Sequence, residues 1–64
     1  MAAVRVNDVP QIQGLTIQLM DTMARIDEAL DRGDRRAFRM WSMKHRSLSG
    51  RLASLLVKIA TTQH

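Results

Sequence analysis

The 64-residue sequence contains no cysteine, so neither a disulfide nor a zinc–thiolate site reinforces its fold. It has one proline, no tyrosine and two aromatic residues, Phe38 and Trp41, which is too few for a base-stacking RNA-binding surface. The longest aliphatic run is Leu55-Leu56-Val57, and the N-terminal segment lacks the apolar core of a secretory signal. We therefore expect a cytoplasmic protein with no membrane-spanning segment, held together by side-chain packing alone.

The residue patterns that support catalysis are also missing. Asp27 and Asp31 lie one helical turn apart, but no apolar pocket is expected there to make one an acid and the other a base. We interpret His45 as a half-buried, hydrogen-bonded core histidine rather than as a ligand or a base. The sequence has no Glu-x-x-His pair and no glycine-rich phosphate loop. It therefore predicts a protein that is not an enzyme, with no catalytic residue, no metal site and no cofactor.

The first helix is predicted from Asn7-Asp8-Val9-Pro10, where Asp8 can cap and Pro10 falls in the first turn. Beyond it, apolar residues recur every three or four positions over about six turns, as on one face of an α-helix. This stripe consists of Ile12, Leu15, Leu19, Met23, Ile26 and Leu30. The pattern predicts a helix over about 8–31, preceded by a flexible segment, 1–7.

Asp31-Arg32-Gly33-Asp34 predicts a tight turn at 32–34. Gly33 suits a left-handed position that ends a helix, and Asp34 suits the cap of the next one. Asp31 and Asp34 are both expected to accept backbone N–H groups around the turn. A second apolar stripe then predicts a helix over about 35–61 within a domain over 8–64, with a kink at most at Ser49-Gly50. It consists of Ala37, Trp41, Leu48, Leu52, Leu55 and Ile59, flanked by Phe38, His45 and Leu56.

Two amphipathic helices joined by a tight turn predict an all-α fold, an antiparallel two-helix hairpin. Such a hairpin has no enclosed interior, because each stripe covers the other from one side only. The first helix carries further apolar residues away from its stripe, at Ile17, Met20 and Ala24. We expect these residues to pair two copies into a homodimeric four-helix bundle. The other interpretation is that they are ordinary surface residues.

Charge is divided unequally between the two halves of the chain. The net charge is +4, but three basic residues face five acidic ones through Gly33, and seven face one from Asp34 onward. We expect Arg35, Arg39, Arg46 and Arg51 to lie together opposite the second stripe, with Met43 adding an adaptable apolar contact. This set predicts a partner-binding face, although a solvated outer face is the alternative. Part of the asymmetry is also expected to let an acidic helix complement a basic one within the hairpin.

The segment from Ile26 to Phe38 resembles the IDEAL domain, a short helical module of Firmicutes proteins that is named for the string read here from Ile26 to Leu30. The resemblance implies a small helical interaction module with regulatory or adaptor roles and no catalytic residues. It implies packing roles for Ile26, Leu30 and Phe38. It implies turn roles for four further residues: Asp27, Asp31, Gly33 and Asp34.

Together these patterns favour a non-enzymatic protein–protein interaction module that self-associates. In this hypothesis, the basic face of the second helix docks an acidic protein partner. The alternative is a nucleic-acid-associated bacterial or phage protein that uses the same face on phosphates. No helix-turn-helix or zinc-finger motif supports that alternative.

Overall fold

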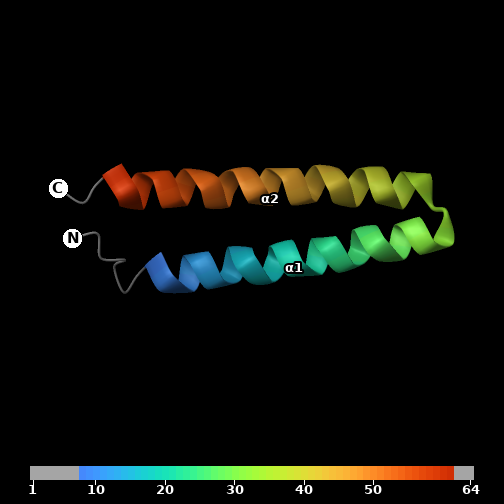
Figure 1. Ribbon diagram of the computed structural model, residues 1–64, viewed down its shortest axis with the longest axis horizontal. Coiled ribbons are helices and arrows are strands. Elements are labelled where there is room, and N and C mark those ends of the chain that lie inside the picture. The colour runs from blue at the N-terminus through green and yellow to red at the C-terminus, as the bar shows by residue number, and fades with distance from the viewer. Residues whose placement is uncertain (1–7, 62–64) are drawn as a thin grey trace.

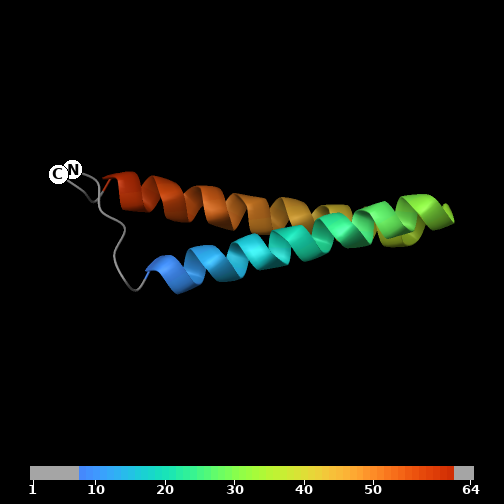
Figure 2. The ribbon, with the colours of Figure 1, turned by 60° about the horizontal axis from the view of Figure 1, so that its bottom comes forward.

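The computed structural model describes residues 8–61, which form two α-helices, α1 (Asp8–Arg32) and α2 (Arg35–Thr61). The helices lie side by side in opposite directions and are joined by a turn at one end (Figure 1). A view from another side shows that they cross rather than run strictly parallel (Figure 2), as packed amphipathic helices do. The predicted all-α hairpin is confirmed, and neither helix is long and apolar enough to cross a membrane. The predicted flexible segment, 1–7, lies outside the described residues.

The two helices begin and continue largely as the sequence predicts. Asp8, predicted as a cap, is the first described residue of α1, and the residues before it lie outside the described part of the chain. Pro10 lies in the first turn of α1, where its missing N–H leaves no helical hydrogen bond unmade. The Ser49-Gly50 pair does not interrupt α2.

The turn between the helices combines two capping motifs. Gly33 has a φ of 67°, and the N–H groups of Gly33 and Asp34 donate to the carbonyls of Leu30 and Ala29 at 3.1 and 2.9 Å, which is a Schellman motif. Asp34 then caps α2, because its carboxylate accepts a hydrogen bond of 3.0 Å from the N–H of Ala37. Both predicted roles are confirmed.

The turn role predicted for Asp31 is wrong. Its carboxylate accepts no hydrogen bond from the described residues. The residue lies exposed in the last turn of α1.

The seam between the helices follows a coiled-coil spacing, with contacts that alternate every three and four residues on both helices. On α1 it consists of Ile12, Leu15, Leu19, Thr22, Ile26 and Ala29. On α2 it consists of Trp41, His45, Leu48, Leu52, Leu55 and Ile59, and near the turn the predicted Ala37 is half-buried while Phe38, 38% exposed, lies at the edge of the seam. The stripe predicted for α2 is therefore close to the observed one, with His45 inside the seam rather than beside it.

The stripe predicted for α1 is wrong at two positions. Thr22 and Ala29 are only 1% and 4% exposed, whereas Met23 and Leu30 are 57% and 59% exposed. Each buried residue precedes an exposed one by a single position, which is a rotation of about 100° around the helix. The large side chains of Met23 and Leu30 therefore flank the seam, and small residues occupy it. The packing role that the family resemblance implies for Leu30 does not apply within the hairpin.

A polar pair lies at the centre of this otherwise apolar seam. Thr22 Oγ1 lies 2.9 Å from the carbonyl oxygen of Leu19 and 2.8 Å from His45 Nδ1. Because the hydroxyl has a single hydrogen, which it donates to Leu19, we assign the proton of the imidazole to Nδ1, which donates to Thr22. His45 is thus a hydrogen-bonded core histidine, as the sequence predicts.

Candidate interaction surfaces

The seam has two flanks, and they differ in chemistry. The first, which we call the polar flank, carries positively charged side chains from both helices. Arg25 of α1 and Lys44 of α2 each lie over the ring of Trp41, at 5.2 and 5.3 Å from its centroid. Arg51 and Lys58 continue this side of α2 at intervals of seven residues from Lys44. The polar flank is therefore solvated along its length.

The second flank, which we call the apolar flank, carries large hydrophobic side chains that remain exposed. On α1 they occupy three positions of one heptad series, Val9, Met23 and Leu30, and the polar Thr16 occupies the fourth. Between the apolar residues, α2 contributes only small serines, Ser42 and Ser49. Its large members are Val9 (41% exposed), Met23 (57%), Leu30 (59%), Phe38 (38%) and Leu56 (47%).

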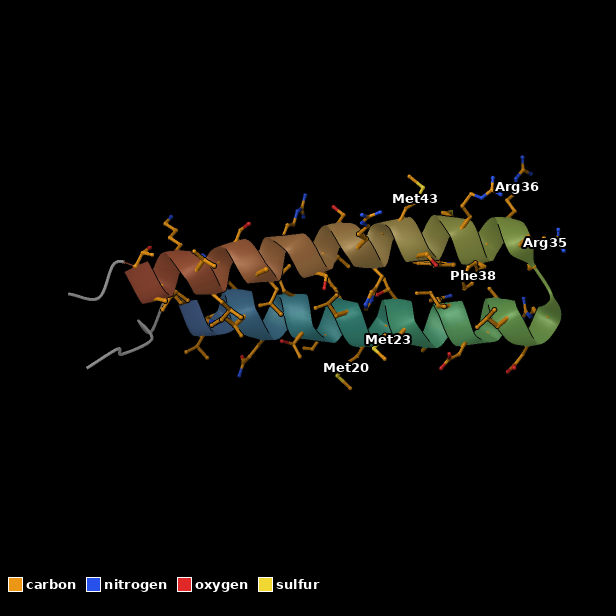
Figure 3. The ribbon with its side chains drawn as sticks, turned by 45° about the horizontal axis from the view of Figure 1, so that its top comes forward. Met20, Met23, Arg35, Arg36, Phe38 and Met43 are labelled. Carbon is orange, nitrogen blue, oxygen red and sulfur yellow. The ribbon has the colours of Figure 1, made fainter. Side chains whose placement is uncertain are left out.

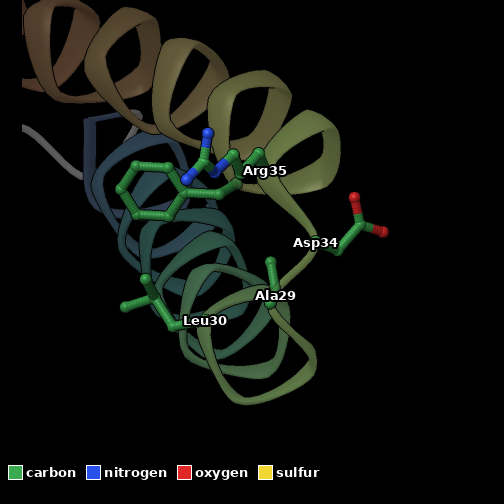
Figure 4. Close-up of a pocket in the computed structure, with 6 residues that line it drawn as sticks. Ala29, Leu30, Asp34 and Arg35 are labelled. Carbon is green, nitrogen blue, oxygen red and sulfur yellow. The ribbon is translucent and has the colours of Figure 1, made fainter.

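The turn end of the apolar flank is hollowed. A depression of about 240 Å³ is bounded by Leu30 and Phe38 on its two sides, with Ala29 between them. Figure 4 shows this hollow beside the turn, with the carboxylate of Asp34 directed away from it. The remaining lining residues are Gly33 and Arg35. The hollow is thus an apolar recess with one cation at its edge.

The predicted contact residues on α2 lie together with one exception. Arg35, Arg39, Met43 and Arg46 follow one another at intervals of four, four and three residues, so they form a continuous line on the helix. All four are exposed, and Figure 3 shows Arg36 and Met43 on the side of α2 turned away from α1, whereas Arg35 extends from the end of α2 at the turn. We call these four residues, with Arg36 beside them, the basic face.

Arg51 does not belong to the basic face. It follows Arg46 by five residues along an uninterrupted helix, which places it about 140° away around the axis. It lies instead on the polar flank with Lys44 and Lys58. The expectation that it joins the other arginines is wrong.

The arginines of the basic face make no ion pair with the described residues. Both ion pairs found within 8–61 lie inside α1, between Asp21 and Arg25 at 3.7 Å and between Glu28 and Arg32 at 2.7 Å. No ion pair therefore joins α1 to α2 among the described residues, and the electrostatic complementarity of the two helices stays a prediction. The charge of the basic face remains available to a partner.

The predicted self-association residues, Ile17, Met20 and Ala24, also share one side of their helix. All three are exposed, with Ile17 at 65% and Met20 at 66%. Ile17 and Ala24 lie on the outermost side of α1, whereas Met20 lies nearer the apolar flank. Figure 3 shows Met20 and Met23 extending from the same side of α1. The heptad spacing of Val9, Met23 and Leu30 is the sequence signal that would have indicated the apolar flank.

We searched residues 8–61 for clusters of side chains that could hold a metal ion and for paired carboxylates. Within 8–61, no three His, Asp or Glu side chains gather closely enough to hold a metal ion. Asp27 and Asp31 are both exposed on α1. The candidate sites are therefore surfaces rather than pockets that hold reacting groups.

Comparison of the chain with protein-family models, with curated proteins and with solved structures finds no match. The resemblance of the segment from Ile26 to Phe38 to the IDEAL domain thus stays a prediction from the residues themselves.

Proposed function

We propose that this protein is a non-catalytic helical interaction module that self-associates and docks an acidic protein partner through its basic face. The observation that carries the docking role is the line Arg35, Arg39, Met43 and Arg46, which is exposed on α2 and whose arginines form no ion pair with the residues in 8–61. Guanidinium groups bind carboxylates through paired hydrogen bonds, and a methionine adapts to irregular apolar surfaces. A regulatory or adaptor role fits a small module whose charged and apolar groups are exposed on its surface for contact with a partner.

Self-association into a four-helix bundle is the second element of the proposal. It is supported by the seam, in which only Thr22, Ala29, Leu48 and Ile59 are buried among the described residues. Chains of this size bury a small share of their surface, and they commonly gain stability by pairing. A second hairpin would supply the cover that a single layer of two helices lacks.

A nucleic-acid partner is the alternative for the basic face. Four arginines with Met43 along a helix fit a row of phosphates as well as they fit a row of carboxylates. The absence of aromatic residues from the basic face argues against contacts with unpaired bases, which stack on aromatic rings. Binding to the phosphates of a duplex is still compatible with the basic face, and its affinity would fall steeply as the salt concentration rises.

The experiment compares two probes by fluorescence anisotropy: a glutamate-rich amphipathic helical peptide and a DNA duplex. We expect the peptide to bind, and the double variant Arg39→Glu/Arg46→Glu to weaken it at least about tenfold. The control Arg51→Glu/Lys58→Glu changes net charge equally on the polar flank and should weaken binding far less. Sedimentation of each variant shows whether its oligomeric state has changed, so that a loss of peptide binding can be assigned to the basic face itself.

Two results would contradict the docking role. One is a peptide affinity that falls equally in both double variants, because a nonspecific charge effect would then explain it. The other is tight DNA binding whose logarithmic salt slope approaches the number of arginines on the basic face, with no binding of the peptide. That second result would favour the nucleic-acid alternative.

A further inference from the structure

We infer that the apolar flank is the surface on which a second copy of this chain packs. The inference rests on the self-association proposed above and names the residues that carry it. It assigns the contact to Val9, Met23, Leu30, Phe38 and Leu56 rather than to the outermost residues of α1, Ile17 and Ala24.

The contrast between the two flanks is the first argument. An isolated pair of helices is expected to carry charged residues on both flanks of its seam, because both face water. Here the polar flank does so, with Arg25, Lys44 and Arg51. On the apolar flank, the equivalent heptad positions of α1 hold Val9, Thr16, Met23 and Leu30, of which Met23 and Leu30 are each more than half exposed. Those of α2 hold a single charged residue, Arg35 at the turn, followed by Ser42, Ser49 and Leu56. Near the turn, the exposed side chains of Leu30 and Phe38 lie around one hollow, and exposed apolar groups that gather in this way mark contact surfaces.

The shape of the apolar flank is the second argument. Met23 projects from α1, while Ser42 and Ser49 leave space beside α2, so the surface alternates large and small side chains. The hollow of about 240 Å³ between Leu30 and Phe38 is wide enough to receive an apolar side chain. A surface with both projections and recesses can be complementary to a copy of itself, as a two-fold symmetric contact requires.

Continuity with the existing seam is the third argument. Ala29 belongs to the seam, Phe38 lies at its edge, and both also line the hollow. A second hairpin placed on the apolar flank would therefore extend the same apolar core instead of building a separate one. Contact on the side of Ile17 and Ala24 would leave the hollow and Leu56 open to water.

Charge at the borders of the apolar flank favours a second copy as its occupant. Asp27 borders the flank on α1, and Arg39 and Arg46 border it on α2. When α1 of one copy packs against α2 of the other, Asp27 lies on the same border as the second copy's Arg39. The two borders then carry unlike charges, which favours this pairing over one between two like helices.

The test measures the dissociation constant of the dimer by sedimentation equilibrium of the full chain. Met23→Glu and Leu56→Glu place a carboxylate on the apolar flank, whereas Ile17→Glu and Val57→Glu place one on equally exposed residues outside it. We expect the native chain to sediment at twice its 7.3 kDa mass. The two flank variants should raise the dissociation constant more than about tenfold, and the two controls should stay within about threefold.

A crosslinking experiment guards against variants that fail to fold. The chain has no native cysteine, so Ser49→Cys on the apolar flank and Ser47→Cys outside it each introduce a single thiol. A short bismaleimide should link two copies through Ser49→Cys and leave the copies of Ser47→Cys without a covalent link.

The results separate failure of the surface from failure of self-association. A native dimer that Ile17→Glu disrupts and Met23→Glu leaves intact would overturn the apolar flank and leave the proposed bundle standing. A native chain that remains monomeric at hundreds of micromolar would overturn both, while the test of the basic face with the acidic peptide would be unaffected. Efficient linkage through Ser47→Cys alone would also overturn the assignment.

Discussion

Thr22 and His45 meet across the seam, with Thr22 Oγ1 2.8 Å from His45 Nδ1. This hydrogen bond fixes which residues of the two helices lie at the same height. Counting seven residues outwards on both helices places Ala29 opposite Phe38 in one direction and Leu15 opposite Leu52 in the other. A polar pair inside an apolar seam thus specifies a single register, because any shift of the helices would separate its two members.

Replacement of Thr22 by valine should lower the free energy of unfolding by about 1–2 kcal/mol, because it leaves the half-buried Nδ1 of His45 without its partner. Thr16→Val is the matched control, since the hydroxyl of Thr16 also donates to a carbonyl of α1, that of Ile12 at 2.8 Å, but is exposed. It should change the free energy by less than about 0.5 kcal/mol. Urea denaturation at one fixed protein concentration measures both.

The same exchange in a His45→Leu background isolates the pair. Without the imidazole, the cost of Thr22→Val should fall by about 1 kcal/mol. An equal cost in both backgrounds would mean that the two side chains are not energetically coupled.

Replacement of glycine by alanine should have opposite effects at Gly33 and at Gly50. Gly33 has a φ of 67°, which an L-residue adopts at a cost, so Gly33→Ala should destabilise the hairpin by about 1 kcal/mol. Gly50 lies within α2, where a Cβ would meet no atom within 4 Å, so Gly50→Ala should stabilise it by about 0.5–1 kcal/mol. Thermal unfolding of the two variants, which differ from the native chain by one methyl group each, measures the difference. Equal melting temperatures would contradict the turn geometry.

Asp34 and Asp31 provide a second matched pair at the turn. Asp34→Ala removes the oxygen that accepts the N–H of Ala37 at 3.0 Å and should cost about 1 kcal/mol. Asp31→Ala removes a carboxylate that accepts no hydrogen bond and lies near the negative end of α1, so it should leave stability unchanged or raise it by up to about 0.5 kcal/mol. Chemical denaturation of both variants provides the comparison. A loss at Asp31 as large as that at Asp34 would show that the helix dipole argument fails here.

The turn was predictable because its chemistry is local. Left-handed backbone favours glycine, and a carboxylate that caps a helix accepts a nearby N–H, so Gly33 and Asp34 indicate their roles without knowledge of the remaining chain. The length and direction of the helices follow from the turn and the apolar stripes. These parts of the fold need no information about which side chains meet.

The composition of the seam was less predictable, because it depends on contacts between the helices. A prediction from hydrophobic spacing favours the more hydrophobic of two adjacent residues, and it therefore placed Met23 rather than Thr22, and Leu30 rather than Ala29, in the contact between the helices. In the hairpin the small residues of α1 lie opposite rings of α2, Thr22 opposite His45 and Ala29 opposite Phe38. These rings occupy the volume between the helices that Met23 and Leu30 were predicted to fill. The sequence would have indicated the seam of α1 only if the alternating spacing of three and four residues had been followed through Thr22, although Thr22 is polar.

The seam has two halves, one beside the turn, where the chain joins the two helices, and one at the open end, where only side-chain packing holds them together. Near the turn, the seam holds Thr22, Ile26 and Ala29 of α1 and the rings of α2, and covalent connection keeps the helices together there. Toward the open end it holds leucines and isoleucines only, and residues such as Leu15 and Leu52 become neighbours only after a long stretch of chain has closed on itself. The strongest aliphatic packing therefore lies where the ends would otherwise fray first. Amide exchange in this molecule should accordingly be nearly as slow toward the open end as beside the turn.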